Sequence, residues 1–293
     1  MRTAAAALAF AALIPAAAAG AVPKSAWYWT LAVDPAHENT LLLGTGSGLF
    51  RSADGGRTWR AAGLGSVNVT SLAESGGTLY LGGVRRRPGV KAVIVAGGAY
   101  ISGPGRTVLA VSRDGGATWK ELRPRGLPDV GVQALAVDPG GGGLYAVVRT
   151  GGLFRSRDGG ATFRAVSSLV GGTPWAVALT ASHRFLSGDM TSGSYVSATG
   201  KQWLRTRFTD PQGGSMVMEY AVQPKSPRHV LMTSYGVLSS ANGGTSWHVV
   251  LRSKVMFGPV AWAPSSPERA YAVGWDRSVW RSGDGGATWS RVS

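Results

Sequence analysis

The sequence contains no cysteine and few acidic residues, and both shortages restrict what the protein can be. Without cysteine, the 293-residue chain has no disulfide bond and no thiol chemistry, so its hydrophobic core must stabilise the fold unaided. Acidic residues number 15, against 30 lysines and arginines, which gives a formal net charge of +15. The four histidines (His37, His183, His229 and His248) are widely separated and form no ligand pattern, so we expect neither a metal nor a cofactor.

A long apolar pattern with helical period is also missing. The chain holds 44 glycines and 11 tryptophans instead, a composition that suits many short strands joined by tight turns. A chain of this length is ample to bury a core.

The positive charge is carried mainly by arginine, which supplies twenty-four of the thirty cations. The planar guanidinium fits carboxylate, sulfate and phosphate groups better than the ammonium of lysine does. The excess therefore favours an acidic partner: an anionic glycan, a cell-wall polymer, lipid headgroups or an acidic protein surface. A plainer interpretation stays open, in which the arginines are spread evenly over the surface and serve solubility.

Residues 1–20 have the pattern of a secretory signal peptide. Met1-Arg2-Thr3 is a basic start, residues 4–14 are apolar, and Ala17-Ala18-Ala19 offers an A-x-A cleavage site. The alternative is an uncleaved membrane anchor, although alanine is weakly apolar and Pro15 interrupts the run. We expect cleavage, no transmembrane segment in residues 21–293, and a location that is secreted, at the cell surface or in a periplasmic space. No nucleic-acid-reading element is recognisable, so nucleic acid is not an expected partner.

One eight-residue phrase recurs along the chain. Its copies are 52–59 (SADGGRTW), 112–119 (SRDGGATW), 156–163 (SRDGGATF), 240–247 (SANGGTSW) and 282–289 (SGDGGATW), with a shortened copy at 197–203 (SATGKQW). The intervals between the closing aromatic residues are 60, 44, 40, 44 and 42 residues. Six copies at a period near 42 residues indicate a repeat architecture.

Each repeat contains the same four short strand patterns. In the first repeat they cover residues 29–35, 40–44, 49–52 and 58–61, and the Asp-Gly-Gly turn joins the last two. Six such repeats without a linker predict an all-β fold, a six-bladed β-propeller of four-stranded antiparallel blades over residues 21–293. The second repeat carries an insertion at about residues 84–106, predicted as an extended loop or hairpin that protrudes, folds over the central channel or packs on its own blade.

The phrase S-x-D-G-G-x-T-W resembles the Asp-box, or BNR repeat, of sialidases, sortilin-type receptors, some plant-polysaccharide glycosidases and photosystem II assembly factors of the Ycf48 type. The resemblance covers residues 28–293, and the spacing of LAVDP, LLLGT and GLFRS is most similar to the Ycf48-like and sortilin-like propellers. It implies the propeller fold and no particular reaction. It also implies that the Asp-box residues hold turns and form neither a metal site nor a catalytic centre. These residues are Ser52, Asp54, Gly56, Trp59, Ser112, Asp114, Gly116, Trp119, Ser156, Asp158, Gly160, Phe163, Ser240, Asn242, Gly244, Trp247, Ser282, Asp284, Gly286 and Trp289.

Strands alternate in direction within a blade, so the connections between them fall on two faces. First-to-second loops and Asp-box turns share one face, whereas second-to-third loops and blade crossings share the other, around the mouth of the channel. Propeller sites usually lie at that mouth, where cations outnumber carboxylates, so we predict a basic binding surface there. Tyr235 and Trp275 either stack on a sugar or a partner side chain, or cover blade edges. The candidate binding residues are Arg85, Arg86, Arg87, Lys91, Arg123, Arg125, Arg149, Arg205, Arg207, Tyr235, Arg252, Trp275 and Arg277.

The enzymatic alternative is a sialidase-like exo-glycosidase. The resemblance implies that such an enzyme needs an arginine cluster, a tyrosine nucleophile activated by a glutamate, and an aspartate acid/base. Glu219-Tyr220 is the only adjacent Glu/Tyr pair, and neighbours on a strand point to opposite faces, so the two cannot share a pocket. Asp189, Asp210 and Asp276 remain as possible acids, without the spacing that indicates two catalytic carboxyls about 5 Å apart.

We therefore favour a secreted, non-catalytic binding or scaffold module. It is expected to be a monomer that presents its basic mouth to an acidic protein surface or an anionic glycan.

Overall fold

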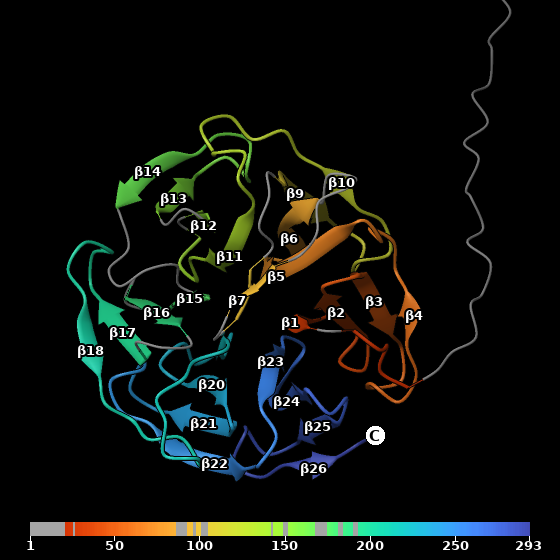
Figure 1. Ribbon diagram of the computed structural model, residues 1–293, viewed down its shortest axis with the longest axis vertical. Helices are drawn as coiled ribbons and strands as arrows, with labels where there is room; N and C mark the ends of the chain where they lie inside the picture. Colours follow the sequence, from red (N-terminus) through yellow and green to blue (C-terminus); the bar gives the residue numbers. More distant parts are fainter. Residues whose placement is uncertain are drawn as a thin grey trace, which may run out of the picture.

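The protein is a closed ring of six four-stranded antiparallel sheets (Figure 1). The computed structural model describes residues 21–25, 27–85, 93–95, 98–100, 105–141, 143–148, 152–167, 175–180, 184–189 and 193–293. Within those ranges every element is a strand, and no helix suited to crossing a membrane is found. The six-bladed β-propeller predicted from the repeats is confirmed.

Each blade is built from a contiguous piece of chain, with its first strand innermost. Blade 1 contains β1 (Tyr28–Val33), β2 (Leu41–Thr45), β3 (Gly48–Ser52) and β4 (Arg60–Ala61). Blade 2 contains β5 (Val67–Ser75), β6 (Thr78–Arg85), β9 (Arg106–Ser112) and β10 (Lys120–Glu121). Blade 3 contains β11 (Val132–Val137), β12 (Leu144–Val148), β13 (Leu153–Ser156) and β14 (Arg164–Ser167).

The second half of the ring repeats this order. Blade 4 contains β15 (Ala176–Leu179), β16 (Phe185–Asp189), β17 (Gly193–Ser197) and β18 (Leu204–Thr206). Blade 5 contains β19 (Tyr220–Val222), β20 (Val230–Ser234), β21 (Gly236–Ser240) and β22 (His248–Arg252). Blade 6 contains β23 (Phe257–Ala263), β24 (Ser266–Gly274), β25 (Val279–Ser282) and β26 (Ser290–Arg291).

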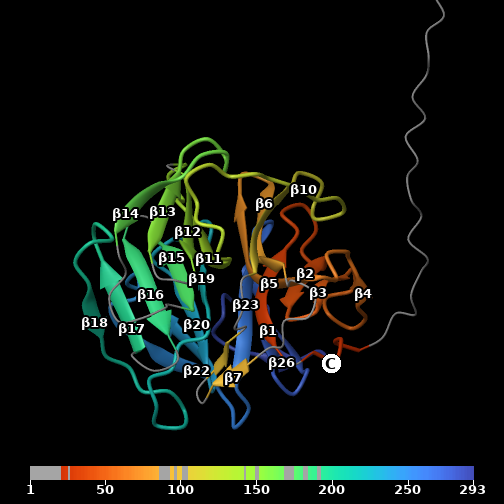
Figure 2. The ribbon, with the colours of Figure 1, turned by 45° about the horizontal axis from the view of Figure 1, so that its top comes forward.

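The insertion in blade 2 contains a small hairpin between β6 and β9. Its strands β7 (Val93–Val95) and β8 (Gly98–Tyr100) pair antiparallel, with Val95 opposite Gly98. Figure 1 places β7 over the middle of the ring, and the turned view of Figure 2 separates it from the inner strands, so it stands over one face of the channel. Of the predicted arrangements, this position of β7 fits the one in which the hairpin lies over the channel.

The middle strands of each blade are buried on both faces because neighbouring blades cover them. In β2 the run Leu41-Leu42-Leu43 is fully buried, with Leu41 and Leu43 in the core shared with blade 6 and Leu42 in the core shared with blade 2. A strand covered on both faces carries a continuous apolar run instead of an alternating pattern. The outer strands β4, β10 and β26 are two residues long and exposed.

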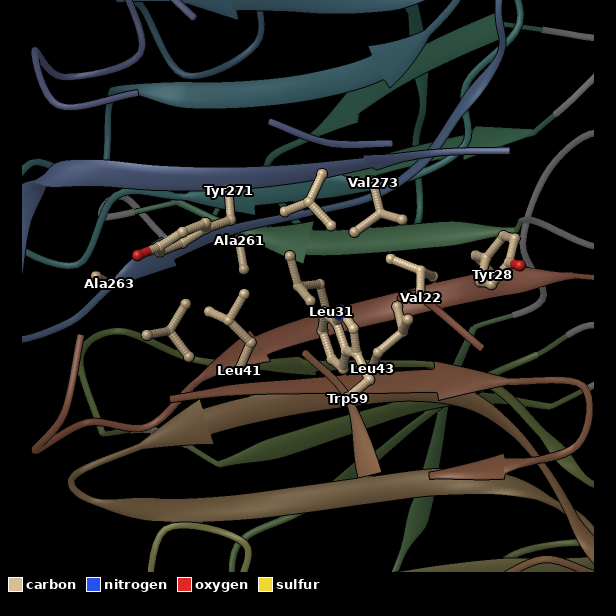
Figure 3. Close-up of a cluster of buried hydrophobic side chains, with 12 residues drawn as sticks. Val22, Tyr28, Leu31, Leu41, Leu43, Trp59, Ala261, Ala263, Tyr271 and Val273 are labelled. Atoms are coloured by element: carbon tan, nitrogen blue, oxygen red, sulfur yellow. The ribbon is translucent and has the colours of Figure 1, made fainter. Parts of the chain in front are cut away.

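Blades 1 and 6 close the ring by side-chain packing. Figure 3 shows Leu31 and Leu43 of blade 1 facing Ala261, Tyr271 and Val273 of blade 6. Arg269 also pairs with Glu38, and the Ser293 hydroxyl donates to the carbonyl oxygen of Gly56 at 3.2 Å. Since β1–β4 and β23–β26 form separate sheets, no strand is shared across this seam.

In five blades the turn between the third and fourth strands is held by side chains. We call these the box turns; they are residues 52–59, 112–119, 156–163, 240–247 and 282–289. In the first, Ser52 Oγ donates to Asp54 Oδ1 (2.8 Å) and accepts from the N–H of Gly56 (2.8 Å), while Asp54 Oδ1 also accepts from the N–H of Thr58 (2.9 Å). The same bonds recur in the turns that contain Asp114, Asp158 and Asp284. The serine and aspartate side chains therefore serve the turn itself.

Glycine is required inside these turns for two reasons. Gly116 has a φ of +83°, in the left-handed region that disfavours other residues. A Cβ added there would also collide with the side chain of Leu42 in blade 1. The glycines thus let each box turn fit against the preceding blade.

Candidate functional site

The central channel has two different ends. The face that carries the box turns and the first-to-second loops is called the turn face, and the opposite one, with the second-to-third loops and blade crossings, the mouth face. The inner strand of each blade runs from the mouth face to the turn face, because β1 begins beside the second-to-third turn and ends at the first-to-second loop.

At the mouth face, tryptophans close the channel. Trp29 of β1 and Trp175, just before β15, come from blades on opposite sides of the ring and stack with ring centroids 5.0 Å apart. Trp27 stacks on Trp29 at 5.4 Å and meets Trp275 edge-on at 5.0 Å. These four half-buried residues are called the tryptophan row. The row adds aromatic rings to the face where the sequence predicts a basic binding surface.

The tryptophan row is held by polar and backbone contacts. The Nε1–H of Trp29 donates to Asn68 Oδ1 at 2.7 Å, which ties blade 1 to blade 2. The N–H of Trp175 donates to the carbonyl oxygen of Gly188 at 2.9 Å. Only Trp275 of the row was among the predicted site residues; the others escaped notice because they begin strands that are far apart in the chain.

Arg85 does not lie free at the mouth. Its strand β6 runs into the start of the predicted insertion and ends at Arg85, whose guanidinium forms an ion pair with Glu121 of β10 through two hydrogen bonds. This bond raises the pKa of Arg85. The charge of the arginine is thereby paired with a carboxylate of its own blade, and its role in binding a partner stays a prediction.

The other predicted cations are distributed around the ring. Six more of the predicted arginines lie within the described residues. All six are exposed, and none forms an ion pair with another described residue; they are Arg123, Arg125, Arg205, Arg207, Arg252 and Arg277. Arg252 lies opposite Gly236, next to the half-buried Tyr235, in blade 5. Arg86, Arg87, Lys91 and Arg149 lie outside the described residues.

Arg125 lies beside a box turn. Its N–H donates to the carbonyl oxygen of Ala161 at 2.9 Å, and its own carbonyl accepts from the N–H of Phe163 at 2.8 Å. The crossing from blade 2 to blade 3 therefore runs along the outer edge of blade 3 at this point. Arg125 therefore lies beside a turn-face element, whereas the sequence predicts it at the mouth.

On the mouth face, the side chains of Asp210 and Asp276 accept hydrogen bonds from backbone N–H groups of their own turns. Asp210 is buried and accepts from the N–H groups of Gln212 (2.8 Å) and Gly214 (3.0 Å) and from the Ser234 hydroxyl (2.8 Å). Asp276 accepts from the N–H of Ser278 at 3.0 Å. Both were considered as catalytic acids, and both are committed to turns. Asp189 ends β16, and its side chain lies outside the described residues.

Glu219 and Tyr220 diverge, as strand alternation requires. The Tyr220 hydroxyl points between blades 4 and 5, where it donates to Ser194 Oγ at 2.7 Å. Glu219 points the other way and accepts from the Thr30 hydroxyl at 2.9 Å and from the N–H of Val260 at 3.1 Å. Burial raises the pKa of Glu219 well above its usual value, although these hydrogen bonds oppose the shift.

Glu219 occupies a repeat position that has small hydroxyl residues in blades 1 and 2. Thr30 and Ser71 stand at this position in blades 1 and 2, and their hydroxyls accept from the inner-strand N–H groups of Leu72 (2.9 Å) and Leu135 (2.8 Å) in the next blade. The longer Glu219 side chain reaches blade 6 in the same way and blade 1 as well. Alignment of the inner strands could have revealed this exception from the sequence.

Below the tryptophan row the channel widens into a cavity of about 330 Å³ that is rimmed by first-to-second loops on the turn face. Its walls are the inner strands, and its acidic residues are Glu74, Asp138 and Glu219, with no lysine, arginine or histidine in the lining. Burial raises the pKa of Glu74, opposed by a hydrogen bond from the N–H of Gly77. In the described part of the chain, no group of three metal-ligating side chains is assembled.

Comparison of the sequence finds no matching protein-family model and no matching curated protein. Comparison of the structure does find similar folds. A structure of YCF48 bound to a D1 peptide matches with a TM-score of 0.54 at 18% identity, covering 94% of this chain and 83% of that one. YCF48 from Cyanidioschyzon merolae matches with a TM-score of 0.52 at 16% identity, covering 94% and 88%.

Two further solved structures have a similar fold. A chain of a nidogen/laminin complex matches with a TM-score of 0.61 at 12% identity, covering 87% of this chain and 92% of that one. A GH74 enzyme from Niastella koreensis matches with a TM-score of 0.50 at 18% identity, and this chain spans only 46% of its length. At these identities the likeness shows that the chain shares the β-propeller fold with them.

Proposed function

We propose that the protein is an exported, non-catalytic binding module whose mouth face engages an acidic protein surface or an anionic glycan. The observation that carries the proposal is the closed mouth. The tryptophan row brings aromatic rings of blades 1, 4 and 6 together at the mouth face, and blades 4 to 6 and their crossings carry exposed arginines without a described ion pair: Arg205, Arg207, Arg252 and Arg277.

The chemistry of this surface suits anionic partners with an apolar or ring component. Aromatic rings supply contact area at low cost in conformational entropy, and exposed guanidinium groups attract carboxylates or sulfates in a salt-dependent way. The net charge of +15 adds long-range attraction to the same partners.

A binding role is also supported by two structures of similar fold, which are complexes: YCF48 with a D1 peptide, and nidogen with laminin. This support is by likeness of fold alone. No described feature favours the glycosidase alternative, since Asp210 and Asp276 each hold their own turn.

Export is proposed from residues 1–20, whose basic start, apolar middle and A-x-A site fit a cleaved signal peptide. Expression with these residues should yield a protein outside the cytoplasm whose intact mass lacks them. Retention of Met1 in the purified protein would contradict cleavage.

The binding proposal is tested by reversing charge on one face at a time. The mouth-face variant is Arg207→Glu with Arg252→Glu; the control is Arg113→Glu with Arg157→Glu, two exposed arginines of box turns on the opposite face. Both variants lower the net charge by the same amount. On immobilised heparin and immobilised poly-glutamate, the mouth-face variant should bind about tenfold more weakly than the control at 0.15 M salt, about the physiological ionic strength. Equal losses in the two variants would contradict the proposal, because only net charge would then matter.

A further inference from the structure

The box turn of blade 5 differs from the others by carrying asparagine. Asn242 keeps the turn bonds, since its Oδ1 accepts from the Ser240 hydroxyl and from the N–H of Ser246, each at 2.9 Å. Its Nδ2 donates to the Ser246 hydroxyl at 2.8 Å. The shape of the turn is thus preserved, and the negative charge that an aspartate supplies in four other box turns is absent.

A pocket of about 270 Å³ lies against this turn, between blades 4 and 5 on the turn face. Thr180, Arg184, Arg228, Asn242 and Gly243 line it.

Each arginine makes one hydrogen bond to the box turn. Arg184 of blade 4 donates from Nη1 to the Thr245 hydroxyl at 3.0 Å, and the carbonyl oxygen of Arg228 in blade 5 accepts from the N–H of Gly243 at 2.7 Å. None of the residues lining the pocket is acidic, and neither arginine forms an ion pair with another described residue.

At the corresponding seam between blades 6 and 1, a glutamate neutralises the arginine. Arg269 stands there where blade 4 has Arg184, and it pairs with Glu38. The carbonyl oxygen of Asn39 accepts from the N–H of Gly55 at 2.8 Å, as that of Arg228 does from Gly243. The box turn beside it contains Asp54.

Four exchanges separate the two seams at these positions: Thr245 in place of Arg57 lowers the positive charge of the seam between blades 4 and 5, and the other three raise it. Pro227 stands in place of Glu38, Arg228 in place of Asn39, and Asn242 in place of Asp54. Two guanidinium groups on one pocket repel each other, and an anion between them converts this repulsion into attraction. Guanidinium groups also match the geometry of oxyanions through paired N–H donors.

We propose that this pocket binds an oxyanion group (sulfate, phosphate or carboxylate) between Arg184 and Arg228. The site lies on the face opposite the tryptophan row and goes beyond the proposed mouth-face function. Asn242 is the residue that makes the site possible, because an aspartate there would occupy the arginines with a charge of the protein's own.

The experiment is calorimetric titration of the full chain with inorganic sulfate, inorganic phosphate and a sulfated disaccharide. The central variant is Asn242→Asp, which restores the aspartate found in four other box turns and so preserves the fold. It should weaken binding about tenfold, and Arg228→Gln should do the same. The matched control is Arg113→Gln in the box turn of blade 2, which should change binding less than about twofold. Urea midpoints of the variants establish that each is folded.

Binding of the inorganic ions identifies a free-anion site, and binding of the disaccharide alone identifies a site for a glycan's sulfate group; either result supports an oxyanion pocket. The proposal is overturned if the wild-type protein binds none of the three probes, or if Asn242→Asp and Arg228→Gln bind them as the wild type does. Loss of binding in the mouth-face variant Arg207→Glu, Arg252→Glu, with retention in Asn242→Asp, also overturns it and assigns the anion to the other face.

Discussion

The box turns predict how the protein loses stability in acid. Hydrogen bonds from the hydroxyl and then the N–H of the threonine four residues later hold the pKa of Asp114, Asp158 and Asp284 at about 2, below the ordinary value of 3.8. The unfolded chain loses these bonds, so it binds more protons than the folded chain between about pH 4 and pH 2. Stability is therefore fully present above about pH 4 and is lost as the pH falls through this window.

The size of the effect follows from these values. At pH 3, a carboxyl with a pKa of about 2 is about one-tenth protonated, whereas the same group with a pKa of 3.8 is about nine-tenths protonated. Each of the three sites thus takes up about 0.8 proton on unfolding, and together they take up about 2.3.

The perturbation is the triple variant Asp114→Asn, Asp158→Asn, Asp284→Asn. Asn242 shows that asparagine keeps the turn, because its Oδ1 accepts the same bonds and its Nδ2 donates to the hydroxyl that an aspartate would accept from. Urea unfolding measured from pH 2 to pH 6 gives the proton uptake from the pH dependence of the free energy of unfolding. The triple variant should take up about 2.3 fewer protons at pH 3. The reverse variant Asn242→Asp should take up about 0.8 more. An unchanged slope in the triple variant would refute the assignment of low pKa values to these hydrogen bonds.

Three further outcomes follow from the site. Trp29→Ala should lower the free energy of unfolding by about 3 kcal/mol in urea titration, because Trp29 stacks on two members of the tryptophan row; a loss as small as that of an exposed residue would show that the row is not stabilising. Burial raises the pKa of Glu219, so the folded state holds a proton on this carboxyl that the unfolded state releases, and the free energy of unfolding of the wild type should fall as the pH rises above about 4.5. Glu219→Gln should show a flatter dependence of this free energy on pH between pH 4 and pH 8, and identical dependences in the two proteins would contradict the reasoning. Glu121→Gln frees Arg85 from its ion pair, so it should cost less than about 1 kcal/mol of stability and increase retention on heparin; unchanged retention would show that the freed arginine does not reach the matrix.

The fold could be predicted because its signal is local and repeated. Each box turn is specified by eight adjacent residues, and the Asp-Gly-Gly segment fixes the hairpin whatever surrounds it. The opposite directions of Glu219 and Tyr220 also followed from the alternation of side chains on one strand.

The site could be predicted only in part, because it depends on contacts between blades. Trp29 and Trp175 meet across the channel from opposite sides of the ring, and no local sequence pattern predicts that contact. The sequence predicts that the insertion begins at about residue 84 and so contains Arg85. In the structure β6 continues to Arg85, and pairing through β9 brings Arg85 to Glu121.

The absence of a shared strand between blades 1 and 6 makes the seam that closes the ring equivalent to the other five. Val22 near one end of the described chain and Val292 near the other pack on the same cluster of core residues, so both segments lie at this seam. A circularly permuted chain that joins residue 293 to residue 21 through a short linker and opens at the crossing near Ser253 should therefore fold into the same ring. The order of the six blades around the ring matters for this structure, and the blade with which the chain starts does not.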